Sequence, residues 1–191
     1  VLHLDLDNFR QTALGQRLLA ELEQEEHRKK LAAFQAVFRF DPRTALHGVT
    51  LYSVSKAEED GVLLLYADVD AGQLTALAQG AKDHQTVSHR NHTIHHWIEE
   101  KRPSKGGNPV RTYGAIYESR VVVFGRREQR VREALDVLDR QQANLTLNPS
   151  LATAMPHQAI LAGVARGGDV AAQDPQGTLL RQSRLLTLAI S

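Results

Sequence analysis

The side chains best suited to chemistry gather in one histidine-rich segment, which runs from Lys82 to Trp97 and holds five of the nine histidines. Neutral imidazoles bind Zn²⁺, Cu²⁺ or Ni²⁺, and three converging rings with a carboxylate would form a metal site. His89 and His92 could approach each other across a tight turn, and His95 could add a ring from the following strand. The candidate ligands of Zn²⁺ or Cu²⁺ are therefore His89, His92 and His95, with Asp83 or His84 in support.

The spacing of these histidines is a poor match to established ligand patterns. Neighbouring residues of a strand point to opposite faces, so only one of His95 and His96 could join such a site. No His-Glu-x-x-His helix is present. A polar hairpin whose imidazoles form hydrogen bonds or face solvent is the favoured interpretation, because histidine clusters predict metal sites only loosely.

Four arginines lie close together near the start of a predicted helix. Cations at this end of a helix oppose the macrodipole and would attract an anionic ligand or an acidic partner. We favour a solvated face with local pairing by Glu128 and Glu133. The arginines are Arg126, Arg127, Arg130 and Arg132.

Two pairs of carboxylates stand two residues apart, Asp5 with Asp7 and Asp68 with Asp70. On a strand each pair would project to one side, as acid–base or cation sites require. Both pairs also stand where a predicted strand leads into a helix, where Asp is a common cap, and capping is the favoured role. The chain has no Gly-x-Ser-x-Gly elbow and no phosphate-binding loop.

The composition does not favour a nucleic-acid partner. The net charge is +1, and only 5% of the residues are aromatic. A locally basic stretch continues from the histidine segment through Lys101, Arg102 and Lys105, with Trp97 as a stacking surface, but Glu99 and Glu100 interrupt it. A groove for single strands needs basic and aromatic residues interleaved on one face.

The chain of 191 residues contains no cysteine, which excludes disulfides, thiolate metal sites and cysteine nucleophiles. No apolar run approaches the roughly 20 residues of a membrane-spanning helix, so we expect no transmembrane segment. Both ends have a strand-like pattern, from Val1 to Asp7 and from Leu185 to Ile190. Because natural termini are usually polar, we expect that a leader and part of the C-terminal region are missing here.

The elements that must position these residues alternate between strands and helices. Apolar–polar alternation and turn residues predict two close strand pairs, each followed by an amphipathic helix. Between them the pattern predicts a hairpin over Val87–Ile98 and a connector over 103–109. The predicted strands are Leu46–Ser53 with Gly61–Val69, and Val110–Tyr117 with Arg120–Gly125; the helices begin after Asp70 and span Glu128–Arg140.

The recurrence of strand, strand and helix predicts an internal duplication, in which Leu63–Leu65 corresponds to Val122–Phe124. The fold class is therefore α+β, with a predominantly antiparallel sheet, helices on one face and two ββα (ferredoxin-like) repeats. The predicted halves are 1–102 and 110–191, joined by a linker at 103–109. One continuous sheet across both halves would fit the pattern equally well.

Several phrases carry a resemblance that spans most of residues 1–145. They are Phe38–Arg43, Leu46–Tyr52, Ile94–Ile98 and Ala134–Asp139. In these the chain resembles a family of uncharacterised bacterial proteins of unknown function that are made with an export leader. The resemblance implies a periplasmic or cell-envelope location and supplies no reaction, cofactor or site residue.

The favoured function is a non-enzymatic exported interaction or structural module, which uses a sheet face or an edge strand to hold a protein partner. An edge strand would also permit homo-oligomers. Two alternatives stay open: a histidine-dependent metal-binding protein, and an enzyme of unrecognised type with a cleft between the halves. The absence of a recognisable catalytic pattern favours the first interpretation.

Overall fold

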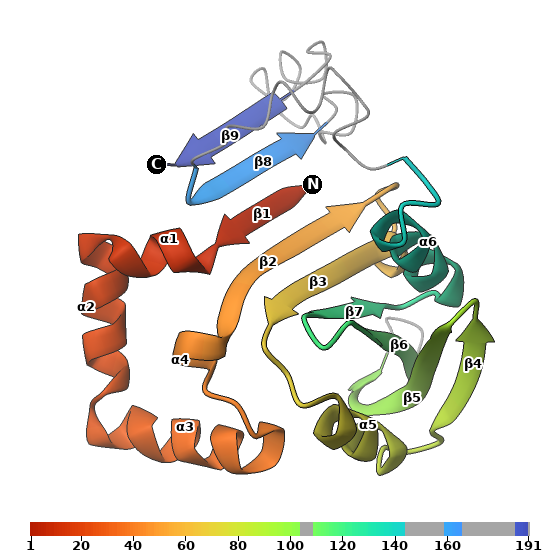
Figure 1. Cartoon of the computed structure of the whole chain (residues 1–191), viewed down its shortest axis with the longest axis horizontal. Coiled ribbons are helices and arrows are strands. Elements are labelled where there is room, and N and C mark those ends of the chain that lie inside the picture. The colour runs from red at the N-terminus through yellow and green to blue at the C-terminus, as the bar shows by residue number, and fades with distance from the viewer. Residues whose placement is uncertain (104–108, 144–158, 166–185, 191) are drawn as a thin grey trace.

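The computed structural model describes residues 1–103, 109–143, 159–165 and 186–190. Its centre is a single sheet of nine strands, in which every neighbouring pair is antiparallel (Figure 1). The strand order is β4-β5-β6-β7-β3-β2-β1-β8-β9. The strands are β1 Leu2–Asp5, β2 Leu46–Ser53, β3 Gly61–Ala67, β4 Gln85–His89, β5 His92–Pro103, β6 Pro109–Tyr117, β7 Val121–Gly125, β8 Leu161–Ala165 and β9 Leu186–Ile190.

Helices fill the connections between the strands. Asp5, Asp41 and Asp70 each cap a helix by accepting a hydrogen bond from a backbone N–H of its first turn. The predicted capping roles of Asp5 and Asp70 are thus confirmed. The helices are α1 Leu6–Gln11, α2 Ala13–Leu22, α3 Glu25–Phe38, α4 Pro42–Ala45, α5 Ala71–Gln79 and α6 Glu128–Leu138, with a 3-10 turn, η1, at Glu58–Asp60.

The main core lies under α6. Val131 and Leu135 of this helix are fully buried against Val62 of β3, Val123 of β7 and Ile94 of β5. We call the side of the sheet that carries these residues the α6 face. Fully burying each of these aliphatic side chains contributes roughly 1.5–3 kcal/mol, so α6 stabilises the centre of the sheet directly.

The other large helix of the sheet region, α5, lies on the opposite side, which we call the α5 face. Val122 and Phe124 alternate with Val123 along β7 and therefore point away from α6. They line a cavity together with Leu74 and Leu77 of α5. The prediction of helices on one face is corrected here: the sheet has a helix on each face.

The two ββα units have the same order of elements, but their helices pack on opposite faces of the sheet. The predicted partners Leu63–Leu65 and Val122–Phe124 are both strands, and they pair directly at the centre of the sheet. A rotation that brings one strand pair onto the other leaves α5 and α6 on opposite sides of the sheet. The α+β antiparallel class is confirmed, whereas ferredoxin-like repeats are not.

One sheet contains strands from both sides of the predicted linker. β5 pairs with β6 around it, β3 pairs with β7, and β1 pairs with β8. The core under α6 likewise draws Val62 from the first half and Val123 from the second. The middle of the linker, residues 104–108, lies outside the described residues.

Helices α1, α2 and α3 form an arm that stands away from the sheet (Figure 1). Its first end is fixed where Arg10 of α1 donates to the carbonyl oxygen of Leu46 in β2. Its second end is fixed at α5, where Gln73 Nε2 donates to the Val37 carbonyl oxygen at 2.7 Å. Between these anchors, α2 buries only Gly15, and its leucines Leu14, Leu18 and Leu22 are exposed.

Candidate binding groove

A wide groove of about 1070 Å³ lies on the α5 face, beyond the part that α5 covers. Its floor follows one row of paired residues across the sheet. Leu2 of β1 pairs with Leu51 of β2, which pairs with Leu63 of β3, which pairs with Phe124 of β7. In the other direction the row continues through Gly163 to Leu188.

The floor is apolar and open to solvent. Leu2, Leu51 and Leu188 are 40%, 49% and 51% exposed. Single exposed leucines are ordinary, but here Leu2 lies beside Leu51 and is separated from Leu188 only by Gly163. They form one apolar surface, and such surfaces mark interaction sites. This row is therefore the strongest candidate for a functional surface.

The rim of the groove is polar and carries both signs of charge. Arg126 is held by Glu58 at 2.9 Å, and Glu99 accepts a hydrogen bond from Thr112 at 3.0 Å. Lys56 adds a second cation on the β2–β3 loop. Because opposite charges alternate around it, the rim provides no concentrated positive field for a phosphate-bearing ligand.

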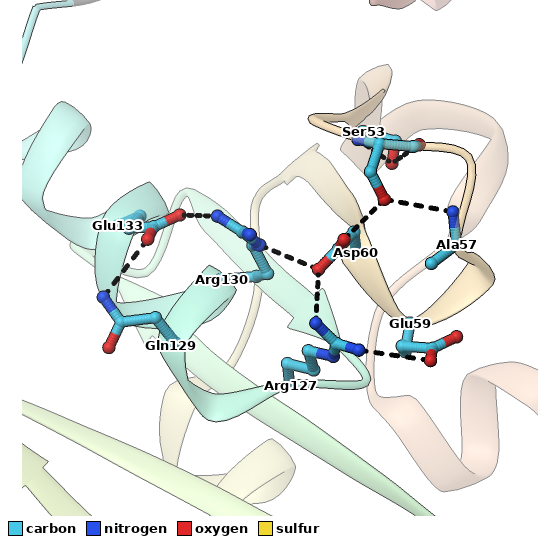
Figure 2. A network of polar contacts seen from close by, with 9 residues as sticks. Ser53, Ala57, Glu59, Asp60, Arg127, Gln129, Arg130 and Glu133 are labelled. Atoms are coloured by element: carbon cyan, nitrogen blue, oxygen red, sulfur yellow. Dashed lines mark hydrogen bonds and ion pairs between the residues drawn. The ribbon is translucent and has the colours of Figure 1, made fainter.

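The arginine cluster beside this rim has a structural role. Asp60, only 5% exposed, binds Arg127 at 3.1 Å and Arg130 at 3.0 Å (Figure 2). Ser55 donates to the same carboxylate at 2.5 Å. The Ser55 hydrogen bond first, and then the one from Arg130, lower the pKa of Asp60. These contacts tie the β2–β3 loop to α6.

The predicted local pairing of the arginines is only part of the arrangement. Arg132 pairs with Glu128 and Arg130 with Glu133, as expected for neighbouring turns of a helix. The long-range partners Glu58, Glu59 and Asp60 lie about seventy residues earlier, where helical spacing gives no signal. The acidic run at the β2–β3 turn was the only available hint in the sequence.

His89 and His92 lie next to each other across the β4–β5 hairpin, as their spacing predicted. The two imidazoles bind different carboxylates: His89 Nε2 lies 2.9 Å from Asp136 of α6, and His92 Nε2 lies 2.8 Å from Asp139, the C-cap of α6. Arg132 contacts the second nitrogen of His89 at 3.0 Å. In this arrangement both ring nitrogens of His89 are occupied, and the hairpin is fastened to α6.

His95 lies on the other side of the sheet from His92. It projects from the α5 face, where its Nδ1 lies 3.0 Å from His84 Nε2. Burial first, and then the neighbouring His84, lower the pKa of His95, so the imidazole is neutral at physiological pH. The three predicted ligands thus do not converge here, and among the described residues no group of three or more His, Asp or Glu side chains is placed to hold a metal. Metal binding by them stays a prediction.

The remaining members of the segment are also engaged. His96 faces the α6 side, with its Nδ1 2.7 Å from Arg111 Nη1, and burial lowers the pKa of His96. Arg111 also binds Asp83. The side chains of residues 100–108, which include the basic Lys101, Arg102 and Lys105, lie outside the described residues.

One carboxylate from each of the two acidic pairs contacts a histidine that the sequence did not single out as a site. His47 of β2 contacts Asp7 at 3.1 Å through Nδ1 and Asp68 at 3.2 Å through Nε2. Asp68 first, and then Asp7, raise the pKa of His47. This contact joins α1 to the end of β3 and so helps to anchor the arm.

None of the described helices is both long and apolar enough to cross a membrane. No model of a known protein family, no curated protein and no solved structure matches this chain. Its function has therefore to be inferred from its own geometry.

Proposed function

We propose that this chain is a non-catalytic binding module, and that the groove on its α5 face holds an apolar segment of a partner protein. The supporting observation is the row of partly exposed leucines Leu188, Leu2 and Leu51, in which Gly163 lies between Leu188 and Leu2. Covering such a row stabilises a complex by about 25 cal/mol for each Å² of apolar surface removed from water, less the costs of association.

The chemistry of the groove favours polypeptide over other ligands. An anionic lipid, a nucleic acid or a free phosphate would need a cluster of available cations, and Arg126 is already paired with Glu58. A rim with both signs of charge suits a partner whose apolar residues are flanked by mixed charges. The volume of about 1070 Å³ lies at the upper limit of ordinary small-molecule pockets, roughly 300–1,000 Å³, and has room for several residues of a peptide.

The titratable groups support binding rather than catalysis. Asp60, Asp136 and His89 are each held by charged partners that fix the fold. In line with the resemblance to exported proteins, we propose that the module acts in the periplasm or cell envelope. Its presence or absence in the periplasmic fraction of the producing bacterium tests that location.

A random dodecapeptide library tests the binding function. The peptides selected on the wild-type chain should be rich in aliphatic residues, and Leu51→Glu should weaken their binding at least tenfold, because it places a charge on the apolar floor. Leu14→Glu makes the same change on α2, at a leucine that is also exposed, and should leave binding unchanged. Folding of both variants is checked by thermal unfolding.

Three outcomes would contradict the proposal. Selection of no peptide that depends on Leu51 would remove the groove as the site. A self-associated wild-type chain that Leu51→Glu converts to a monomer would assign the groove to a second copy. Binding to vesicles of phosphatidylcholine that is lost in the same variant would assign it to a lipid surface.

A further inference from the structure

A second cavity, which shares Phe124 with the groove floor described above, lies between α5 and the sheet. It has a volume of about 240 Å³ and is walled mainly by apolar side chains. Such walls do not hold water well, because a buried water needs two to four polar partners. For scale, an apolar cavity of about 150 Å³ in another protein binds benzene. The walls include Leu74, Leu77, Phe38, Val122, Phe124 and Trp97.

One wall carries a single buried polar group, the imidazole of His95, which is only 8% exposed. Its Nδ1 is taken by His84, and no other contact of His95 is recorded among the described residues. No fully buried side-chain nitrogen or oxygen in the described part of the chain lacks a partner. It follows that Nε2 of His95 is not fully buried. The His95 side chain lines the cavity, and Nε2 is its one ring nitrogen without a hydrogen-bond partner among the described residues.

The contact with His84 allows Nε2 of His95 to act either as a hydrogen-bond donor or as an acceptor toward a ligand. The two imidazoles share one hydrogen between Nε2 of His84 and Nδ1 of His95. When His84 donates it, Nε2 of His95 carries a hydrogen and is a donor; when His95 donates it, Nε2 is an acceptor. A hydroxyl or a carbonyl oxygen in the cavity can therefore be matched, whereas a carboxylate would be buried there without a cation.

A glycine in the middle of β6 makes room for the aromatic part of the wall. A Cβ atom at Gly114 would lie 3.1 Å from Trp97 Cη2 and 3.2 Å from Phe124 Cε1. These two rings meet edge to face, with centroids 6.5 Å apart. Glycine inside a strand often marks a place where another group approaches closely, and here it lets both rings line the cavity.

We propose that this cavity is a binding site for a small uncharged ring compound that carries one hydroxyl or carbonyl group. The ring is held by Trp97, Phe124 and the α5 leucines, and the polar atom is held by Nε2 of His95. This site shares only Phe124 with the lining of the groove in Proposed function, and it stands whether or not the groove binds a peptide.

The cavity contains its own reporter, because Trp97 is the only tryptophan of the chain. Three probes of one size test the chemistry: benzyl alcohol, toluene without the hydroxyl, and benzoate with a charge. Each is titrated against Trp97 emission. Benzyl alcohol should give a saturable change and bind roughly threefold to tenfold more tightly than toluene, the range of one net hydrogen bond. Benzoate should bind most weakly.

His95→Phe should abolish the preference for benzyl alcohol over toluene. His96→Gln is the matched control, because His96 is the next residue of the same strand and faces the other side of the sheet. Ala78→Leu adds volume to the cavity wall without removing a contact, so it should reduce the binding of all three probes even if His95→Phe fails to fold. An unchanged Trp97 emission with every probe, or equal binding of benzyl alcohol and toluene to the wild-type chain, would overturn the proposal.

Discussion

At the scale of single residues, many of the described charged and imidazole groups join one element to another. Asp60 receives two arginines and one serine hydroxyl (Figure 2), and Asp136 receives His89 and Arg90. Polar groups that are buried with complete partners specify an arrangement, because loss of one partner leaves the other unpaired. The His95 imidazole differs, because it lines a cavity and only its Nδ1 has a hydrogen-bond partner among the described residues.

The lowered pKa of Asp60 predicts a stability that depends on pH. A carboxyl whose pKa is lower in the folded than in the unfolded chain stabilises the fold above its unfolded value, and this stabilisation is lost as pH falls through the folded value. The loss of stability of Asp60→Asn relative to wild type should therefore be large at pH about 6 and shrink toward pH about 3. Urea unfolding at several pH values measures this difference.

Ser55→Ala provides the control for that experiment. It removes the contact that contributes most to lowering the pKa of Asp60 and leaves both arginines in place. The pKa of the carboxyl should then rise toward its ordinary value, so the acid loss of stability begins at higher pH. If the stability of Asp60→Asn had the same pH dependence as that of the wild type, the ion pairs of Asp60 would not contribute to the loss of stability at low pH.

At the scale of elements, local pattern predicted the strands well and the faces poorly. The bounds of β2 agree with the predicted Leu46–Ser53, and β3, β6, β7 and α6 differ from their predicted ranges by one or two residues at their ends. The alternation of apolar and polar residues along a strand does not determine which face of the sheet a helix will cover. In β3 every position from Val62 to Tyr66 is apolar, so its pattern gave no sign that Leu63 forms the floor of an open groove.

The groove could not be predicted from the sequence for a related reason. The groove joins residues of β1, β2, β3, β7 and β9, which meet only through the long-range pairing of the sheet. The metal-site prediction took His89, His92 and His95 as neighbours, but the strand period of two sends His92 and His95 to opposite faces.

The anchor of the helical arm at His47 gives a second prediction. Its raised pKa means that the charged imidazole stabilises the fold below its unfolded pKa, and that this contribution is lost as pH rises through the folded value. His47→Gln should therefore destabilise the chain more at pH about 5.5 than at pH about 8.5, and by no more than about 1 kcal/mol because the pair is exposed. Asp68→Asn should lower the pKa of His47 in an NMR titration, and an unaltered titration would contradict the contact.

At the scale of the whole molecule, the central pair of strands joins the two sequence halves. β3 and β7 lie at the middle of the sheet, and their side chains build the core under α6 together with β5 and β6. A separated half would expose one side of this pair and lose part of the core. One sheet and one core thus contain residues from both halves.

The third prediction follows from this shared core. Residues 1–103 expressed alone should show no cooperative unfolding transition in urea, because Val62 and Leu64 lose Val123 and the buried face of α6. Mixing the two halves, 1–103 and 109–191, should restore a transition. A cooperative transition in the first half alone would show that it is an independent domain.

The direction of the arm depends on Gly15, which lies at the corner between α1 and α2. A Cβ atom at Gly15 would collide with the carbonyl oxygen of Phe9, so any larger residue forces the two helices apart. The ten residues of α2 extend about 15 Å from that point, and a small opening at the corner is magnified along this lever. The direction of α2 therefore depends on the missing side chain of Gly15. A substitution at this one position would turn α2, and with it Leu14, Leu18 and Leu22, relative to the sheet.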